Sequence, residues 1–167
     1  MYLAVVLVSQ ITEHIHISTV HSLLMQPETI FSVANTFPLI GWLLLIIAPR
    51  WKFTLTLVRL VVVLLLVLLY ASIAAFSFGE GEGGFGSLAE VSQLFENPWS
   101  LLAGWVHYLA FDLFVGSWEV ENAQKLGVSH WLVIPCLLLT LLLGPVGLLL
   151  YFILRTIVTK KLTHELA

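Results

Sequence analysis

The hydrophobic residues of this chain gather in four long blocks. The blocks cover residues 30–48, 54–78, 99–118 and 131–154, and the last contains no charged residue. About 20 helical residues cross the roughly 30 Å hydrocarbon core of a bilayer. In lipid, only helices or closed barrels satisfy the backbone, and these blocks lack the alternation of barrel strands. We therefore predict an all-α fold, an integral membrane four-helix transmembrane bundle.

Three polar connections join the blocks. Residues 48–53 are so few that the first two helices must form a tight antiparallel hairpin. The second connection, residues 79–98, begins with five glycines in eight residues. Ser87 and Glu90 follow with the spacing of a capping box, which predicts a short helix lying on the membrane surface. Residues 119–130 form the third connection.

The predicted membrane domain covers residues 25–157 and is followed by a short polar tail, residues 158–167. Met25 begins "MQPETIFSVAN", an acidic first turn that leads into an apolar helix, and we expect it to be the natural start. Residues 1–24 are then a poorly defined extension outside the functional domain. Three histidines lie in that extension: His14, His16 and His21.

Composition supports a membrane protein and excludes several other classes. The chain is 59% hydrophobic and only 10% charged, whereas a soluble domain has about 25% charged residues. A net charge of −3 gives no reason to expect nucleic-acid binding. No glycine-rich phosphate loop is present. Cys136, the only cysteine, lies in an apolar run, so we expect a buried core residue, no disulfide framework and no cysteine-rich metal site. We also expect no other metal site and no cofactor.

The charge distribution does not settle the orientation of a four-span bundle. One side would carry Arg50, Lys52 and Lys125, and the other Arg155, Lys160 and Lys161. The connection 79–98 has no Lys or Arg, which favours the outside for it, but the basic tail argues the opposite.

The third block contains two ionisable residues near its middle, Asp112 and His107. An ionisable group inside a membrane costs between about 2.5 and more than 10 kcal/mol, so it faces the bundle interior, a partner or water. At 100° per residue the two side chains lie about 140° apart and line different walls. One stripe of this helix contains Trp105, Tyr108, Asp112 and Glu119, and the other His107, Phe111, Phe114 and Trp118.

Arg59 in the second block lies at the same depth as Asp112, which predicts an ion pair between them. With Glu119 and His130 these two residues would form a polar cluster in one half of the bundle. Two structural interpretations stay open: Arg59 extends to the headgroups, or Asp112 is simply a buried structural pair. For Asn35 we favour an interhelical hydrogen bond over contact with a ligand.

The fourth block is interrupted by prolines and glycines. They are Pro135, Gly144, Pro145 and Gly147. A kink in the helix is the default interpretation, and a groove for a long apolar ligand is the alternative.

The strings "PETIFSVAN", "GWLLLIIAPRW", "WVHYLAFDLFVG" and "HWLVIPCLLLTLLLGPVGLLLY" resemble the plant abscisic-acid-deficient-four family and its bacterial homologues. The resemblance covers residues 25–157. Plant members are plastid membrane proteins needed to convert violaxanthin to neoxanthin. For this chain the resemblance implies a multi-pass integral protein of a bacterial inner or thylakoid-type membrane that acts in carotenoid (xanthophyll) metabolism.

The reaction implied by this resemblance opens a 5,6-epoxide to an allene without net redox change, and no flavin, haem or iron is demanded. It needs an acid at the epoxide oxygen and a base at the neighbouring polyene carbon. Asp112 or Glu119 would supply the acid and His107 the base. Arg59 would stabilise the oxyanion. The residues expected to bind the ligand are Trp105, Tyr108, Phe111, Phe114, Trp118, His130 and Asn35.

A non-catalytic function is the alternative. The same groove would then hold a carotenoid or a quinone, or stabilise a pigment–protein complex, without turnover. In both cases the expected partners are the lipid bilayer and a long apolar ligand. The sequence is compatible with a homo-oligomer but does not require one.

Overall fold

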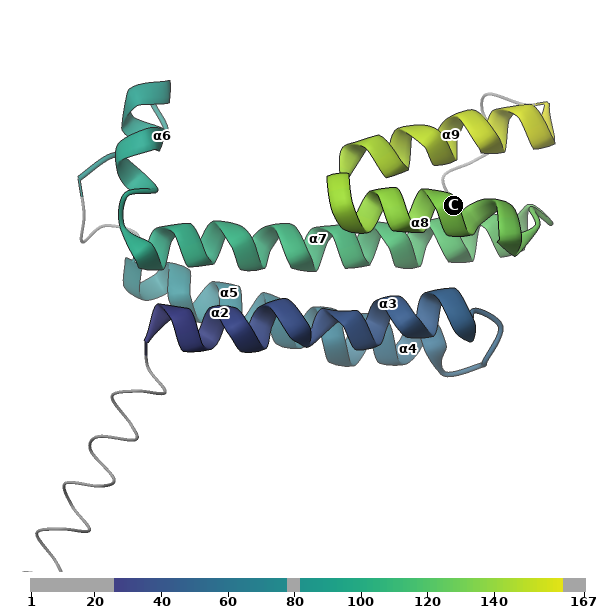
Figure 1. Ribbon diagram of the computed structural model, residues 1–167, viewed down its shortest axis with the longest axis horizontal. Coiled ribbons are helices and arrows are strands. Elements are labelled where there is room, and N and C mark those ends of the chain that lie inside the picture. Colours follow the sequence, from purple (N-terminus) through teal and green to yellow (C-terminus); the bar gives the residue numbers. More distant parts are fainter. Residues whose placement is uncertain (1–25, 78–81, 161–167) are drawn as a thin grey trace, which may run out of the picture.

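The computed structural model describes residues 26–77 and 82–160, and every regular element in them is helical. Figure 1 shows long helical segments lying side by side along one axis, with a shorter pair of helices covering part of α7. The predicted extension 1–24 and the start at Met25 lie outside the described residues.

The first two predicted blocks form two long helical rods. One consists of α2 (Pro27–Thr36) and α3 (Pro38–Ile47), which join without reversal because Phe37 between them is itself helical. The other consists of α4 (Thr54–Leu57), a π-helical segment (Val58–Val63) and α5 (Leu64–Ser77). The two rods, of 21 and 24 residues, are long and apolar enough to cross a membrane, with mean hydropathies of 2.0 and 2.7.

The predicted tight turn between these rods is confirmed. The hydroxyl of Thr54 donates to the backbone oxygen of Ala48 over 2.6 Å, which fastens the start of the second rod to the end of the first. Thr54 is completely buried, so its hydroxyl needs a partner within the protein, and the backbone oxygen of Ala48 provides one.

The third helix is longer than predicted. α7 runs over 28 residues, Pro98–Lys125, and Asn97 caps its start by accepting from the backbone N–H of Trp99 over 2.9 Å. Most of the predicted connection 119–130 is therefore helix, and only residues 126–129 connect α7 to α8. The physical reason is burial: Glu119 and Asn122, which look like linker residues in the sequence, face a neighbouring helix instead of water.

The fourth predicted span is wrong as a single helix. The four-helix transmembrane bundle is not confirmed, because only the first two rods among the described residues are long and apolar enough to count as candidate membrane spans. Residues 131–154 divide into α8 (His130–Leu143) and α9 (Pro145–Thr159), of 14 and 15 residues, which fold back on each other (Figure 1). At 1.5 Å per residue each measures only about 22 Å. The architecture is three long rods with a hairpin about half as long as α7 packed on that helix.

Two glycines make this reversal. Gly144, between the helices, has φ +50° and ψ −100°, a conformation that residues with a Cβ rarely adopt. Gly147 lies so close to Thr140 that a Cβ on it would overlap the backbone of that residue. Gly144, Pro145 and Gly147 therefore turn the chain back, where a kink in a continuous helix was expected, whereas Pro135 lies inside α8.

The core is centred on α7, where glycines on two helices receive large side chains from each other. A Cβ on Gly41 of α3 would lie 2.8 Å from Leu113, and one on Gly116 of α7 would lie 2.6 Å from Trp42. Cys136 is buried, as predicted. Such reciprocal packing lets α3 and α7 approach closely without empty space between them.

The short helix predicted from the capping box is confirmed as α6 (Leu88–Leu94). Ser87 accepts from the backbone N–H of Glu90 over 3.2 Å, but the carboxylate of Glu90 reaches the N–H of Gly86 rather than that of Ser87. Figure 1 shows α6 crossing the axis of the rods at the end where α7 begins.

Candidate functional site

Asp112 lies midway along α7, where the tip of the α8–α9 hairpin meets it. A Cβ on Gly144 would be 2.9 Å from Oδ1 of Asp112. The other oxygen, Oδ2, is buried and has no hydrogen-bond partner among the described residues. Tyr108, one turn earlier, interacts with the same carboxylate. An acid with an unused acceptor atom therefore lies at the edge of the hairpin.

The half of α7 that precedes this acid is not covered by the hairpin (Figure 1). Its exposed hydrophobic residues include Leu101, Trp105 and Phe111. Tyr108 is partly exposed between them, and its ring lies 5.5 Å from that of Trp105. We call Leu101, Trp105 and Tyr108 the aromatic shelf; it ends at Asp112, while Phe111 lies toward His107 on the neighbouring face of α7.

The predicted ion pair between Arg59 and Asp112 is wrong. Nη2 of Arg59 lies 2.7 Å from Oε2 of Glu121, and its Nε donates to the hydroxyl of Ser117 over 2.8 Å. Its guanidinium also lies 5.8 Å from the ring centre of Phe114. Because α7 continues beyond residue 118, Glu121 becomes available at a depth where the sequence predicted a connection.

Glu119 is completely buried beneath the hairpin. Its Oε1 accepts from the hydroxyl of Thr140 on α8 over 3.0 Å, while Oε2 has no partner in the described part of the chain. Tyr151 of α9 donates to the side chain of Asn122 over 2.7 Å. Arg155 is also buried and interacts electrostatically with Tyr151. These residues, Glu119, Asn122, Thr140, Tyr151 and Arg155, form the hairpin cluster.

Four members of the hairpin cluster were missed by reasoning from the sequence. A continuous helix over 131–154 would place Thr140 and Tyr151 far apart in depth, and only the reversal at Gly144 brings both against α7. The available signal was Thr140, a polar residue in a run otherwise made of leucines just before Gly144 and Pro145.

The two histidines predicted for the site, His107 and His130, form no contact with Asp112 among those that the structure describes. His107 is exposed on another face of α7, where its ring stacks on Phe111 at 4.4 Å and meets Tyr70 of α5 at 5.3 Å. The predicted polar cluster is therefore divided. His130 bonds through Nε2 to the backbone oxygen of Ile46 over 2.9 Å, while Asp112 and Glu119 still interact electrostatically.

The remaining predicted binding residues have structural partners. Asn35 accepts from the indole N–H of Trp105 over 3.2 Å, which confirms the interhelical hydrogen bond. Trp118 does not line the shelf, because it packs against Tyr151 and Phe152 of α9 at ring distances of 5.6 and 5.8 Å.

A family model described as ABA DEFICIENT 4-like matches residues 29–151. The chain belongs to the ABA DEFICIENT 4-like family. No curated protein and no solved structure matches it. The region that matches the ABA DEFICIENT 4-like model contains Asp112, the aromatic shelf and the hairpin tip.

Membership of the ABA DEFICIENT 4-like family suggests a role connected with carotenoids or xanthophylls. Together with the two long apolar rods it supports a membrane protein. Within residues 26–77 and 82–160, no three His, Cys, Asp or Glu side chains gather in a way that would hold a metal ion.

Proposed function

We propose that this protein isomerises a carotenoid 5,6-epoxide to an allene, with Tyr108 and Asp112 as the acid–base pair. The observation that carries the proposal is the carboxylate of Asp112, which has an unpartnered oxygen beside Tyr108 at the end of the aromatic shelf. This pair replaces His107 and Asp112, because His107 stacks on Phe111 on another face of α7.

The aromatic shelf suits a rigid polyene. Leu101 and Asp112 are eleven residues apart, about 16 Å along a helix, and the exposed side chains between them are flat or apolar. Phe95, after α6, packs on Gly104 near the far end: a Cβ on that glycine would be 2.8 Å from the Phe95 ring. The polyene would lie along α7, with its epoxide-bearing ring at Asp112.

In the proposed reaction the hydroxyl of Tyr108 gives its proton to the epoxide oxygen as the C–O bond breaks. The carboxylate of Asp112 takes the proton from the adjacent polyene carbon, and the electrons of that C–H bond form the new double bond of the allene. Asp112 then returns its proton to Tyr108. The substrate gains and loses one proton, so the product is an isomer and no cofactor takes part.

The test is conversion of violaxanthin by the full chain in liposomes, followed by chromatography of the pigments. Removing a general acid or base costs about 10²–10⁴-fold in rate, so we expect such losses for Asp112→Asn and Tyr108→Phe. Glu121→Gln is the matched control, since this carboxylate belongs to the Arg59 pair. Normal conversion by both site variants would show the assignment to be wrong.

A second function, carotenoid binding without turnover, is favoured by an apolar groove between α2 and α5. The groove has a volume of about 370 Å³ and is lined by residues such as Ile30, Phe37 and Leu69. Pockets of roughly 300–1,000 Å³ typically bind small ligands. Protein purified from a carotenoid-producing host distinguishes the two functions: unchanged bound pigment indicates a binder, and an altered pigment an enzyme.

A further inference from the structure

Two cavities adjoin each other at the end of the molecule where α3 turns into α4 and α7 into α8. The first has a volume of about 490 Å³, and its polar lining comes from Arg50, Gln124, Ser129 and His130. The side-chain amide of Gln124 donates to the backbone oxygen of Pro49 over 2.7 Å and holds the two turns together. The cavity is thus a built feature between two connected turns.

We propose that this cavity binds the phosphate headgroup of an anionic membrane lipid. Within residues 26–77 and 82–160 Arg50 is exposed and forms no ion pair, so its guanidinium is available for two-pronged binding of a phosphate. His130 forms a hydrogen bond through Nε2 with the backbone oxygen of Ile46. Since a carbonyl only accepts, Nε2 carries the hydrogen, and Nδ1 of the neutral ring can accept a hydrogen bond from a headgroup hydroxyl but cannot donate to the phosphate.

The adjoining second cavity fits the acyl chain of the same lipid. It has a volume of about 600 Å³, shares Arg50, Ser129 and His130 with the first, and adds an apolar lining. That lining includes Ile46, Ile47, Trp51, Trp131 and Ile134. Trp131 is 81% exposed and Trp51 49%, and exposed tryptophans are typical of the level where headgroups meet acyl chains.

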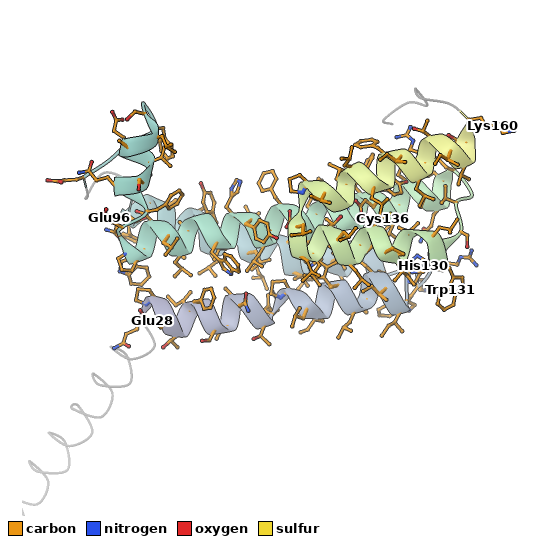
Figure 2. All side chains as sticks on the ribbon, turned by 45° about the horizontal axis from the view of Figure 1, so that its top comes forward. Glu28, Glu96, His130, Trp131, Cys136 and Lys160 are labelled. Carbon is orange, nitrogen blue, oxygen red and sulfur yellow. The ribbon has the colours of Figure 1, made fainter. Side chains whose placement is uncertain are left out.

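The charge at this end of the molecule also favours an anion. Lys125 directly follows Gln124 of the first cavity in the sequence, and its acidic partner, Glu121, is shared with Arg59. In Figure 2, His130, Trp131 and Lys160 lie at this end, whereas Glu28 and Glu96 lie at the opposite end. A positive surface at the headgroup level attracts anionic lipids.

The experiment is native mass spectrometry of the full chain, purified in mild detergent and mixed with phosphatidylglycerol or phosphatidylcholine of identical acyl chains. We expect at least fivefold preference for phosphatidylglycerol, lost in Arg50→Gln. The matched control is Lys52→Gln, which removes a neighbouring cation that lies over Phe53 and lines neither cavity. Equal retention of both lipids by the wild type, or unchanged preference in Arg50→Gln, would overturn the proposal.

A second arm separates a lipid from a free phosphate compound. Glycerol 3-phosphate at 10 mM should not displace phosphatidylglycerol, and Trp131→Ser should weaken retention of the lipid several-fold. Displacement by glycerol 3-phosphate together with an unaffected Trp131 variant would indicate a site for soluble phosphates and refute the lipid. Melting temperatures of the variants, all at exposed positions, verify that each is folded.

Discussion

At the scale of single residues, two acids on α7 differ through their surroundings. Glu119 is sealed beneath the hairpin and bonded to Thr140, whereas Asp112 lies at the edge of the hairpin beside Tyr108. The sequence correctly placed Tyr108 and Asp112 on one stripe of the helix and predicted the interhelical hydrogen bond of Asn35. It could not identify the partner of Arg59, since that depended on where α7 ends.

The hairpin cluster gives a first prediction. Glu119→Leu leaves the hydroxyl of Thr140 buried without its acceptor, which costs about 1–3 kcal/mol. Glu119→Gln keeps an acceptor oxygen and should lose less. Chemical unfolding of both variants in detergent measures the difference, and equal stability of the two would show that the bond to Thr140 is unimportant.

The pair formed by Arg59 and Glu121 gives a second prediction. Hydrogen bonds from Arg59 hold the pKa of Glu121 below its ordinary value of 4.5. A lowered pKa in the folded state stabilises the protein above that ordinary value, and the contribution disappears as the pH falls through the folded value. Stability should therefore fall between about pH 5 and pH 3 more steeply in the wild type than in Glu121→Gln. Parallel curves would contradict the pairing.

At the scale of elements, the hairpin shows where sequence patterns stop being informative. Periodicity and capping residues predicted α6 well, because a Ser–Glu cap is a local signal. Apart from Thr140, residues 131–154 are almost entirely apolar, so the pattern is nearly the same for one crossing helix and for two shorter helices packed together. The decisive feature is the positive φ of Gly144, which sequence reasoning took for part of a kink.

Gly144 also gives a matched experiment on the hairpin tip. Gly144→Ala forces a strained backbone, at about 1–3 kcal/mol, and brings a Cβ 2.9 Å from Oδ1 of Asp112. Gly127→Ala has a comparable φ of +69° but no atom within 4 Å of the new Cβ. We expect both to lower the melting temperature and only Gly144→Ala to reduce pigment conversion beyond the loss of folded protein. Equal pigment conversion per folded molecule by Gly144→Ala and Gly127→Ala would show that the hairpin tip does not contribute to the site.

At the scale of the whole molecule, the reversal at Gly144 changes the distribution of charge. The sequence placed basic residues on both sides of a four-span bundle, which left the orientation open. With the hairpin folded back, the end of α9 returns to the end where α7 finishes and α3 turns (Figure 1). Arg50, Lys52, Lys125 and Lys160 then share one side, and the positive-inside rule gives a consistent answer.

This arrangement predicts the membrane topology. Single cysteines introduced at Lys52, Ser129 and Thr159 in a Cys136→Ala background should all be labelled from the cytoplasmic side. One at Glu96 should be labelled from the opposite side. Four complete crossings would instead put Thr159 with Glu96, so labelling of Thr159 from the outer face would disprove the half-length hairpin.

The short hairpin finally has a consequence for how a ligand reaches the protein. If the predicted orientation holds, the uncovered half of α7 would face the acyl chains of the outer leaflet, and the hairpin would lie only in the inner leaflet. A pigment dissolved in that leaflet would reach this surface of α7 without leaving the hydrocarbon of the bilayer and without passing through a gate. It would diffuse laterally along the uncovered half of α7 as far as the tip of the hairpin, where Asp112 lies.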